Sequence, residues 1–204
     1  MWERIFGALR APGKTLNQVA EKNLWKEGLL IIVVVAILQG MSSLVAQGNQ
    51  DLLFRYLEQF SDQPLMDSIQ YSPAFTIFSS LFGGLLAWVI AGGIFFLFAK
   101  LFKGQGTFSG MLAGLGYAST PYIIGAPLVA LASLAGAGGL IIGGVISFAV
   151  AIWVLVLNII AIRESQQIGT GAAVATFLIP VVLLFILALI LAGVIVAMLM
   201  TFTG

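Results

Sequence analysis

The charged residues of this chain are confined to a few short stretches of its sequence. Asp, Glu, Lys and Arg are absent from four long segments, 28–50, 68–99, 104–162 and 165–204. A helix that crosses the hydrocarbon core of a bilayer needs about 20 mostly apolar residues. The third segment is long enough for two crossings and each of the others for one. A soluble domain needs charged side chains over its whole surface, so this distribution predicts an integral membrane protein.

The composition agrees with that prediction and sets the fold class. Hydrophobic residues make up 60% of the chain and charged residues 8%, against about 45–50% and about 25% in soluble domains. The first apolar run is longer than the roughly 7–15 residues of a signal peptide and no clear Ala-x-Ala site follows it, so we expect it to be retained. We predict an all-α, polytopic membrane helical bundle with five transmembrane helices, at about 28–47, 76–100, 109–134, 139–162 and 173–200.

The basic residues fall on one side of the five predicted spans. Loops rich in Lys and Arg stay in the cytoplasm, and all nine basic residues except Arg55 precede the first span or follow the second or fourth. Arg55 lies among acidic residues between the first two spans. We therefore predict a cytoplasmic N-terminus and a C-terminus on the outside. The chain then consists of a cytoplasmic amphipathic segment, 1–26, and a five-helix transmembrane domain, 27–204.

The first ten residues have the spacing of an amphipathic helix. Their apolar side chains recur at i, i+3, i+4 and i+7, at Trp2, Ile5, Phe6 and Leu9. We expect Arg4 and Arg10 to reach lipid headgroups from the opposite face. The interpretation that we favour is a helix that lies on the membrane beside the bundle, and the alternative is a sensor of lipid or curvature.

Residues 12–18 predict the start of a second helix. Pro12 and Gly13 end the first helix, and Thr15 with Gln18 fits a capping box, whose side chains bond the free amides of a helix start. Gly13-Lys14-Thr15 also resembles the end of a phosphate-binding loop. That loop needs a glycine where this chain has Ala8, and a preceding strand, so we expect no nucleotide site.

The segment 49–73 is the long polar loop of the chain. Its apolar residues share one helical face, which we expect to rest on the outer leaflet: Leu53, Tyr56, Leu57 and Phe60. Calcium takes about six to eight oxygen ligands from a shaped loop, and the four acidic residues here do not form such a pattern. We therefore predict a solvated acidic loop rather than a metal site.

The spans offer few groups that can support chemistry. The chain has no Cys and no His, and the interiors of the predicted spans contain no Asp, Glu, Lys or Arg. General acid–base catalysis needs a titratable group beside the substrate, and proton-coupled pumps keep an ionisable residue within the membrane. We expect a protein that is not an enzyme, with no catalytic residue, cofactor, metal ion or nucleic-acid partner.

The candidate functional or packing residues lie mainly in the third and fourth spans. Pro121 has no N–H for the carbonyl of Tyr117, so we expect a kink there, with Ser119 or Thr120 satisfying the freed groups. A kinked span either lines a cavity or only fits round its neighbours, and both alternatives stay open. We expect Asn158 to clamp a neighbouring helix rather than to bind a substrate. The remaining candidates are Gly116, Arg163 and Glu164.

Small residues recur at every fourth position in three of the spans. They are Gly83, Ala87 and Ala91; Gly110 and Gly114; and Gly139, Gly143, Ser147 and Ala151. This spacing lets helix backbones approach closely, either as packing seams within one bundle, which we favour, or as surfaces for self-association. The run 136–139 predicts a tight outer turn between the third and fourth spans.

Several motifs in this order resemble the Yip domain family, the Ypt/Rab-interacting membrane proteins. The third span has a Gly-Tyr-x-x-x-Pro-like pattern at Gly116, Tyr117 and Pro121, after a Gly-rich, Phe-containing loop at 104–108. Further similar motifs are Pro12-Gly13-Lys14-Thr15 with Trp25, Trp153-Val154-Leu155, Ile162-Arg163-Glu164 and Gly169-Thr170-Gly171-Ala172. The resemblance covers nearly the whole chain and implies five spans with a cytoplasmic N-terminus.

The resemblance also bears on partners and location. Eukaryotic relatives bind Rab GTPases and one another in vesicle traffic, and they carry a longer N-terminal region with an Asp-Leu-Tyr-Gly-Pro-like motif. This chain has only 1–26 before its first span and lacks that motif, which puts a GTPase partner in doubt and favours a prokaryotic member in the inner membrane. We expect membrane lipids, copies of itself or other membrane proteins as partners. The alternative function is a small passive transporter, channel or lipid-translocating protein.

Overall fold

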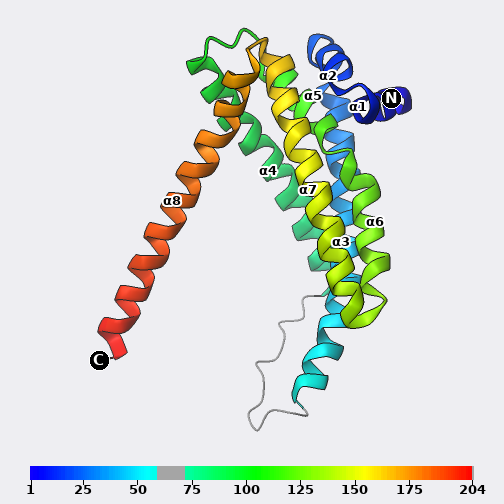
Figure 1. Ribbon diagram of the computed structural model, residues 1–204, viewed down its shortest axis with the longest axis vertical. Coiled ribbons are helices and arrows are strands. Elements are labelled where there is room, and N and C mark those ends of the chain that lie inside the picture. Colours follow the sequence, from blue (N-terminus) through cyan, green and yellow to red (C-terminus); the bar gives the residue numbers. More distant parts are fainter. Residues whose placement is uncertain (59–71, 204) are drawn as a thin grey trace.

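The computed structural model describes residues 1–58 and 72–203, which form helices joined by short connections (Figure 1). No strand occurs in these two ranges, so the all-α prediction is confirmed. The helices are α1 (Trp2–Arg10), α2 (Pro12–Glu21), α3 (Trp25–Glu58), α4 (Pro73–Leu101), α5 (Phe108–Ala118), α6 (Pro121–Ser133), α7 (Gly136–Gln166) and α8 (Thr170–Thr203).

Five stretches of helix are long and apolar enough to cross a membrane, as predicted. They are Trp25–Gln47, Pro73–Leu101, Phe108–Ser133, Gly138–Gln166 and Thr170–Ile195. The N-terminus and the C-terminus lie at opposite ends of the molecule (Figure 1). We call the end that carries α1, α2 and the junctions 102–107 and 167–169 the basic end. Its assignment to the cytoplasm stays a prediction from the charge distribution.

The third span is broken, as the proline predicted. α5 ends at Ala118 and α6 begins with Pro121 as its first residue. The N–H of Thr120 donates to the carbonyl of Tyr117 at 3.2 Å, so the carbonyl that proline cannot serve keeps a partner. The hydroxyl of Ser119 donates to the carbonyl of Leu115 at 3.1 Å. The kink is therefore a two-residue junction between separate helices, and its backbone groups are satisfied locally.

Glycines bring α5 into close contact with α3 and α7. A Cβ added to Gly116 would lie 2.5 Å from the Cα of Gly28, and one added to Gly114 would lie 3.2 Å from the Cβ of Ala161. Side chains of ordinary size would hold these helices farther apart, so the glycines set the spacing of the bundle centre. The seam predicted at Gly110 and Gly114 is confirmed, since Gly110 also approaches the carbonyl oxygen of Ala20 in α2.

Two local predictions, of a packing glycine and of a helix cap, were wrong. Gly83 has no atom within 4 Å of an added Cβ, whereas Gly84 approaches Ala36 at 3.2 Å, so the packing glycine of α4 is the neighbouring one. α2 begins at Pro12 with Ala11 as its N-cap, because proline fits the first helical position, and Thr15 is thus an interior residue rather than a cap.

The predicted turn at 136–139 is also shorter than expected. α7 already begins at Gly136, which takes a left-handed φ of +65°, and Leu134 and Ala135 make the connection to α6. α3 continues to Glu58, into the segment predicted as loop. The predicted leaflet contact of 53–60 lies outside the side chains that the structure describes.

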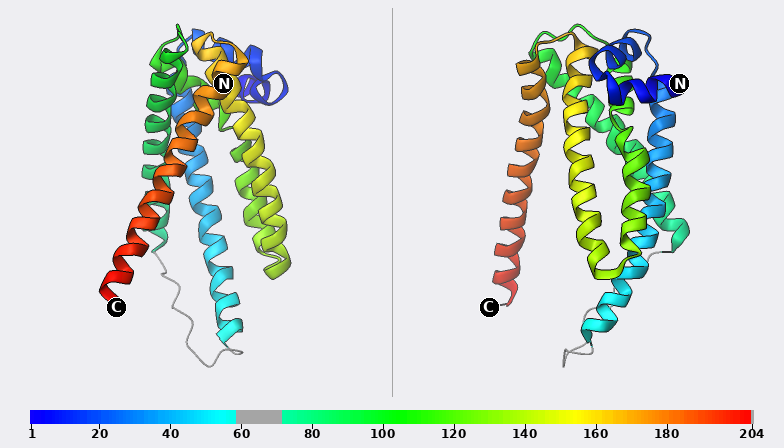
Figure 2. Two further views of the ribbon diagram at one scale, coloured as in Figure 1. Left: turned by 60° about the vertical axis from the view of Figure 1, so that its left-hand side comes forward. Right: turned by 45° about the vertical axis from the view of Figure 1, so that its right-hand side comes forward.

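α8 leaves the bundle part-way along its length. Its first turns pack on α4 and α7, where Ala173, Thr176 and Pro180 are buried and the rings of Phe177 and Phe95 lie 5.3 Å apart. From 181 to 195 every residue is exposed, and the helix diverges from the other spans (Figures 1 and 2). From 181 to 195, α8 therefore presents an apolar surface on all sides.

Candidate functional site

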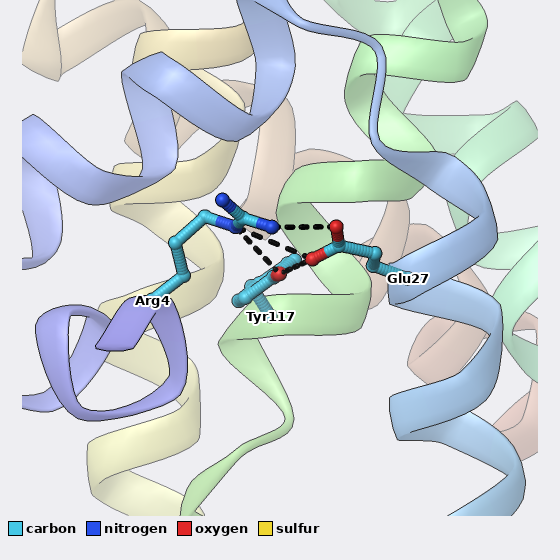
Figure 3. Close-up of polar contacts among 3 residues, drawn as sticks. All are labelled: Arg4, Glu27 and Tyr117. Carbon is cyan, nitrogen blue, oxygen red and sulfur yellow. Dashed lines mark hydrogen bonds and ion pairs between the residues drawn. The ribbon is translucent and has the colours of Figure 1, made fainter. Parts of the chain in front are cut away.

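Three polar side chains meet where α1, α3 and α5 come together at the basic end (Figure 3). The Arg4 guanidinium of α1 donates to both carboxylate oxygens of Glu27, at 2.6 and 3.2 Å, and to the Tyr117 hydroxyl at 3.3 Å. The Tyr117 hydroxyl in turn donates to Glu27. We call these three residues the docking cluster, since they fix α1 on the transmembrane bundle.

The environment of the docking cluster strengthens its bonds. Tyr117 is fully buried, and the Arg4 and Glu27 side chains are only 32% and 27% exposed. The pKa of Arg4 is raised above its ordinary value because Glu27 and Tyr117 accept its hydrogen bonds. Arg4 therefore faces the bundle and not the lipid headgroups, which corrects the prediction for this residue. The buried Ile5 and Ala8 lie on the same helix and add apolar contact.

The Gly-rich loop after α4 packs on the end of α7. An added Cβ on Gly106 would collide with the carbonyl of Ser165, so only glycine fits there. The Lys100 ammonium donates to the carbonyls of Gly104 and Gly106, at 2.8 and 3.0 Å. The Gln166 amide donates to the carbonyl of Thr107 at 3.3 Å. The Lys100 bonds hold the loop against α4, and the Gln166 bond holds it against α7 next to the first turn of α5.

Arg163 and Glu164 lie beside the first turn of α2. The Arg163 guanidinium donates to Glu164 at 2.5 and 3.0 Å and to the Thr170 hydroxyl at 3.4 Å. A Cβ on Gly13 would lie 3.3 Å from Nη2 of Arg163. These residues therefore bring α2, α7 and α8 together at the basic end.

Two polar pockets lie deeper between the spans. The first, the amide pocket, has a volume of about 200 Å³ and is lined by Gln39, Trp88, Ser119, Tyr122 and Asn158 among others. The second, the serine pocket, has a volume of about 500 Å³ and includes Ser42, Ser43, Ser80 and Ser147. Gln39 and Tyr122 line both pockets, and among the described residues no charged side chain lines either of them. Ser119 and Tyr122, on either side of the break in the third span, line the amide pocket.

The whole arrangement matches a known family. Residues 6–200 match the model of the Yip1 domain. The chain belongs to the Yip1 domain family. An uncharacterized protein of Methanocaldococcus jannaschii, MJ0794, is 28% identical over 123 residues, which cover 60% of this chain and 82% of that protein. No solved structure matches the chain.

The structure gives three residues of the third-span motif of this Yip1 domain a physical task. Gly116 allows the close approach to Gly28, Tyr117 belongs to the docking cluster, and Pro121 starts α6. Ser119 and Asn158 share the amide pocket. Tyr117 is not among the residues that line that pocket. Thr120 is buried, and its hydroxyl has no hydrogen-bond partner among the described residues.

Sequence analysis missed several residues that matter in the Yip1 domain. Arg4 and Glu27 are 23 positions apart in the sequence. Their places at the edges of two predicted helices suggested that each lies near the membrane surface, but nothing in the sequence suggested that they contact each other. Trp88 donates from its ring to the carbonyl of Leu112 at 3.1 Å, which ties α4 to α5. Asn23 accepts from the hydroxyls of Thr107 and Ser109, both at 2.9 Å. No periodicity marks such contacts, because their partners come from other helices.

Proposed function

We propose that this Yip1 domain protein is a non-enzymatic membrane protein that organises its membrane through contacts with other membrane proteins or with copies of itself. The observation that carries the proposal is that α1 is docked on the bundle at the basic end. α1 is held by the docking cluster, and it exposes 68% of Trp2 and 57% of Phe6 to its surroundings. Large apolar side chains fixed at a membrane surface suit a partner or the lipid boundary.

The exposed surface of α8 and the charge of the basic end support the same proposal. The distal half of α8 is exposed on every side from 181 to 195, and helices in a bilayer associate by packing and hydrogen bonding. The net positive charge of the basic end favours the cytoplasmic face of a prokaryotic inner membrane. Neither feature requires a reacting group.

Site-specific cross-linking tests the proposal. A photo-reactive phenylalanine analogue at Phe6 should give a discrete cross-linked product in native membranes, and the product should disappear when Arg4→Ala releases α1. The same analogue at Phe148, which is 70% exposed on α7, is the matched control. A protein that stays monomeric in native mass spectrometry from lipid and gives no product at Phe6 would contradict the proposal.

The polar pockets favour a second candidate, a small passive path for ions or lipids. Amide and hydroxyl groups line the amide pocket and the serine pocket within the span region. Reconstituted vesicles loaded with ion-sensitive dyes or fluorescent lipids test this candidate directly. Flux no greater than that of empty vesicles would eliminate it and leave the first proposal standing.

A further inference from the structure

The amide pocket and the serine pocket adjoin each other inside the bundle. Gln39 of α3 and Tyr122 of α6 line both of them. The serine pocket also reaches Ser43 and Ser147, which lie in the halves of their spans away from the basic end. The amide pocket lies closer to the basic end, where it reaches Leu115 of α5. The two pockets therefore form a polar region within the part of the bundle that crosses the membrane.

Several polar side chains in these linings have no partner within the protein. Five of them form no side-chain hydrogen bond with another described residue: Gln39, Ser42, Tyr122, Ser147 and Asn158. The hydrocarbon region offers no bulk water to satisfy them, and an unpaired amide or hydroxyl there is costly. Each amide has two donors and an acceptor, and each hydroxyl can both donate and accept. The pockets therefore require an occupant that forms hydrogen bonds.

Charge and volume limit what can occupy the pockets. An ion would lose its hydration without gaining a counter-charge, because among the described residues no charged side chain lines either pocket. A hydrocarbon chain would leave the amides and hydroxyls unpaired. A water molecule takes up about 30 Å³ in the liquid, so pockets of about 200 and 500 Å³ have room for several. Water, and small uncharged molecules with hydroxyl or amide groups, match the linings.

Close packing around α5 seals the pockets on the side of the basic end. Every residue of α5 from Met111 to Ala118 is buried. Leu112 fills the space beside Gly92, where an added Cβ would lie 2.5 Å from its Cδ2. The ring N–H of Trp88 donates to the carbonyl of Leu112 at 3.1 Å. Access to the amide pocket therefore runs from the opposite side, through the serine pocket.

We infer that the amide pocket and the serine pocket form one water-filled cavity, which admits small uncharged molecules with hydroxyl or amide groups and ends blind at α5. Such a cavity is a binding site for these molecules rather than a path for ions or lipids across the membrane. The inference goes beyond both proposed functions, because it concerns solvent and small solutes. Its test measures access to the cavity, so its outcome is independent of cross-linking at Phe6 and of vesicle flux.

Single cysteines in the full chain, held in lipid nanodiscs, test the inference, since the chain has no native Cys. Methanethiosulfonates react with the thiolate, and apolar surroundings raise the pKa of a thiol, so reaction requires water at the sulfur. Ser147→Cys reports on the serine pocket and Ser119→Cys on the amide pocket. Both should react with uncharged hydroxyethyl methanethiosulfonate at least about tenfold faster than Val145→Cys. Val145 is the matched control, 65% exposed on the surface of α7.

Charged reagents and a blocking variant test the other two parts of the inference. Cationic and anionic methanethiosulfonates of similar size, corrected for their rates with a free thiol, should react with Ser119→Cys at least about tenfold more slowly than the uncharged one. Ala151→Trp narrows the serine pocket and should slow the uncharged reaction at Ser119→Cys, whereas Ile152→Trp, 48% exposed and outside both linings, should not.

Three outcomes would overturn the inference. A Ser119→Cys rate equal to that of Val145→Cys would mean a dry pocket, and equal rates for charged and uncharged reagents would mean that the cavity takes ions. An unchanged rate in the Ala151→Trp background would contradict entry through the serine pocket. Serine and cysteine differ in one atom, so the two reporters keep the fold and decide the question of hydration even if Ala151→Trp fails to fold.

Discussion

Replacing Arg4 with alanine should release α1 from the bundle while leaving the five spans in place. The substitution removes the three hydrogen bonds that Arg4 donates, two to Glu27 and one to Tyr117. Hydrogen bonds to charged groups contribute about 1.5–3 kcal/mol, whereas exposed ion pairs contribute about 0.2–1 kcal/mol. The Arg4 and Glu27 side chains are 32% and 27% exposed, which places the loss between these limits, at about 1–2 kcal/mol.

A buried cysteine reports the release. The chain has no native Cys, and Ala8 lies on α1 with 0% exposure, so Ala8→Cys reacts with a maleimide only when α1 leaves the bundle. When docking is fast, the reaction rate follows the population of the open state. A loss of about 1–2 kcal/mol therefore predicts a labelling rate about 5 to 30 times higher in the Arg4→Ala background.

The control and the refuting outcome are well separated. Arg10→Ala removes a guanidinium from the same helix at an exposed position, and it should leave the Ala8→Cys labelling rate unchanged. If Arg4→Ala also leaves the rate unchanged, then α1 is held by the apolar contacts of Ile5 and Ala8 alone. The docking cluster would then have no part in holding α1 on the bundle, and the argument from its hydrogen bonds would be wrong.

Three further predictions follow from the contacts described above. Gly116→Ala should lower the free energy of unfolding by about 1–3 kcal/mol through overpacking against Gly28, seen as a lower melting temperature in detergent, while Gly83→Ala, with open space around it, should not; equal melting temperatures would count against the close approach. Lys100→Met should free the Gly-rich loop and speed its proteolysis at 102–107, because the bonds to Gly104 and Gly106 are lost; unchanged cleavage would show that Gln166 and Ser165 hold the loop alone. Single cysteines at Ser61, Gln105 and Gly204 should label from outside, inside and outside respectively, and any other pattern would contradict the predicted orientation.

Local features of the sequence predicted most of the fold. Apolar length located the five spans, and Pro121 located the break in the third, because both effects act within one helix. Contacts between helices could not be predicted from these local features. Whether Gly83 or Gly84 faces α3 depends on how α4 is rotated, and a four-residue spacing is compatible with both. The divergence of α8 depends on which of its turns find a neighbour, which hydropathy does not reveal.

The candidate site could be predicted only in part, because contacts between helices do not show in local features of the sequence. Asn158 and Ser119 were chosen as polar groups within apolar helices, and they do share a pocket. The docking cluster was missed because its members come from three helices, and the contact between Arg4 and Tyr117 spans 113 positions. An arginine on the polar face of an amphipathic helix looks the same in a sequence whether it bonds a lipid phosphate or a buried carboxylate. Only the position of Glu27 at the start of α3 separates the two cases.

The break in the third span connects the two parts of this site. Tyr117 lies just before the junction and belongs to the docking cluster, whereas Ser119 and Tyr122 lie within and just after it and line the amide pocket. The close contact of Gly116 with Gly28 and the hydrogen bond from Thr120 to Tyr117 leave this junction little freedom. The angle between α5 and α6 therefore fixes both where the Tyr117 hydroxyl meets α1 and how wide the pocket opens beside Asn158. A substitution that moves the junction should change both α1 docking and the accessibility of the amide pocket, whereas Arg4→Ala should change docking alone.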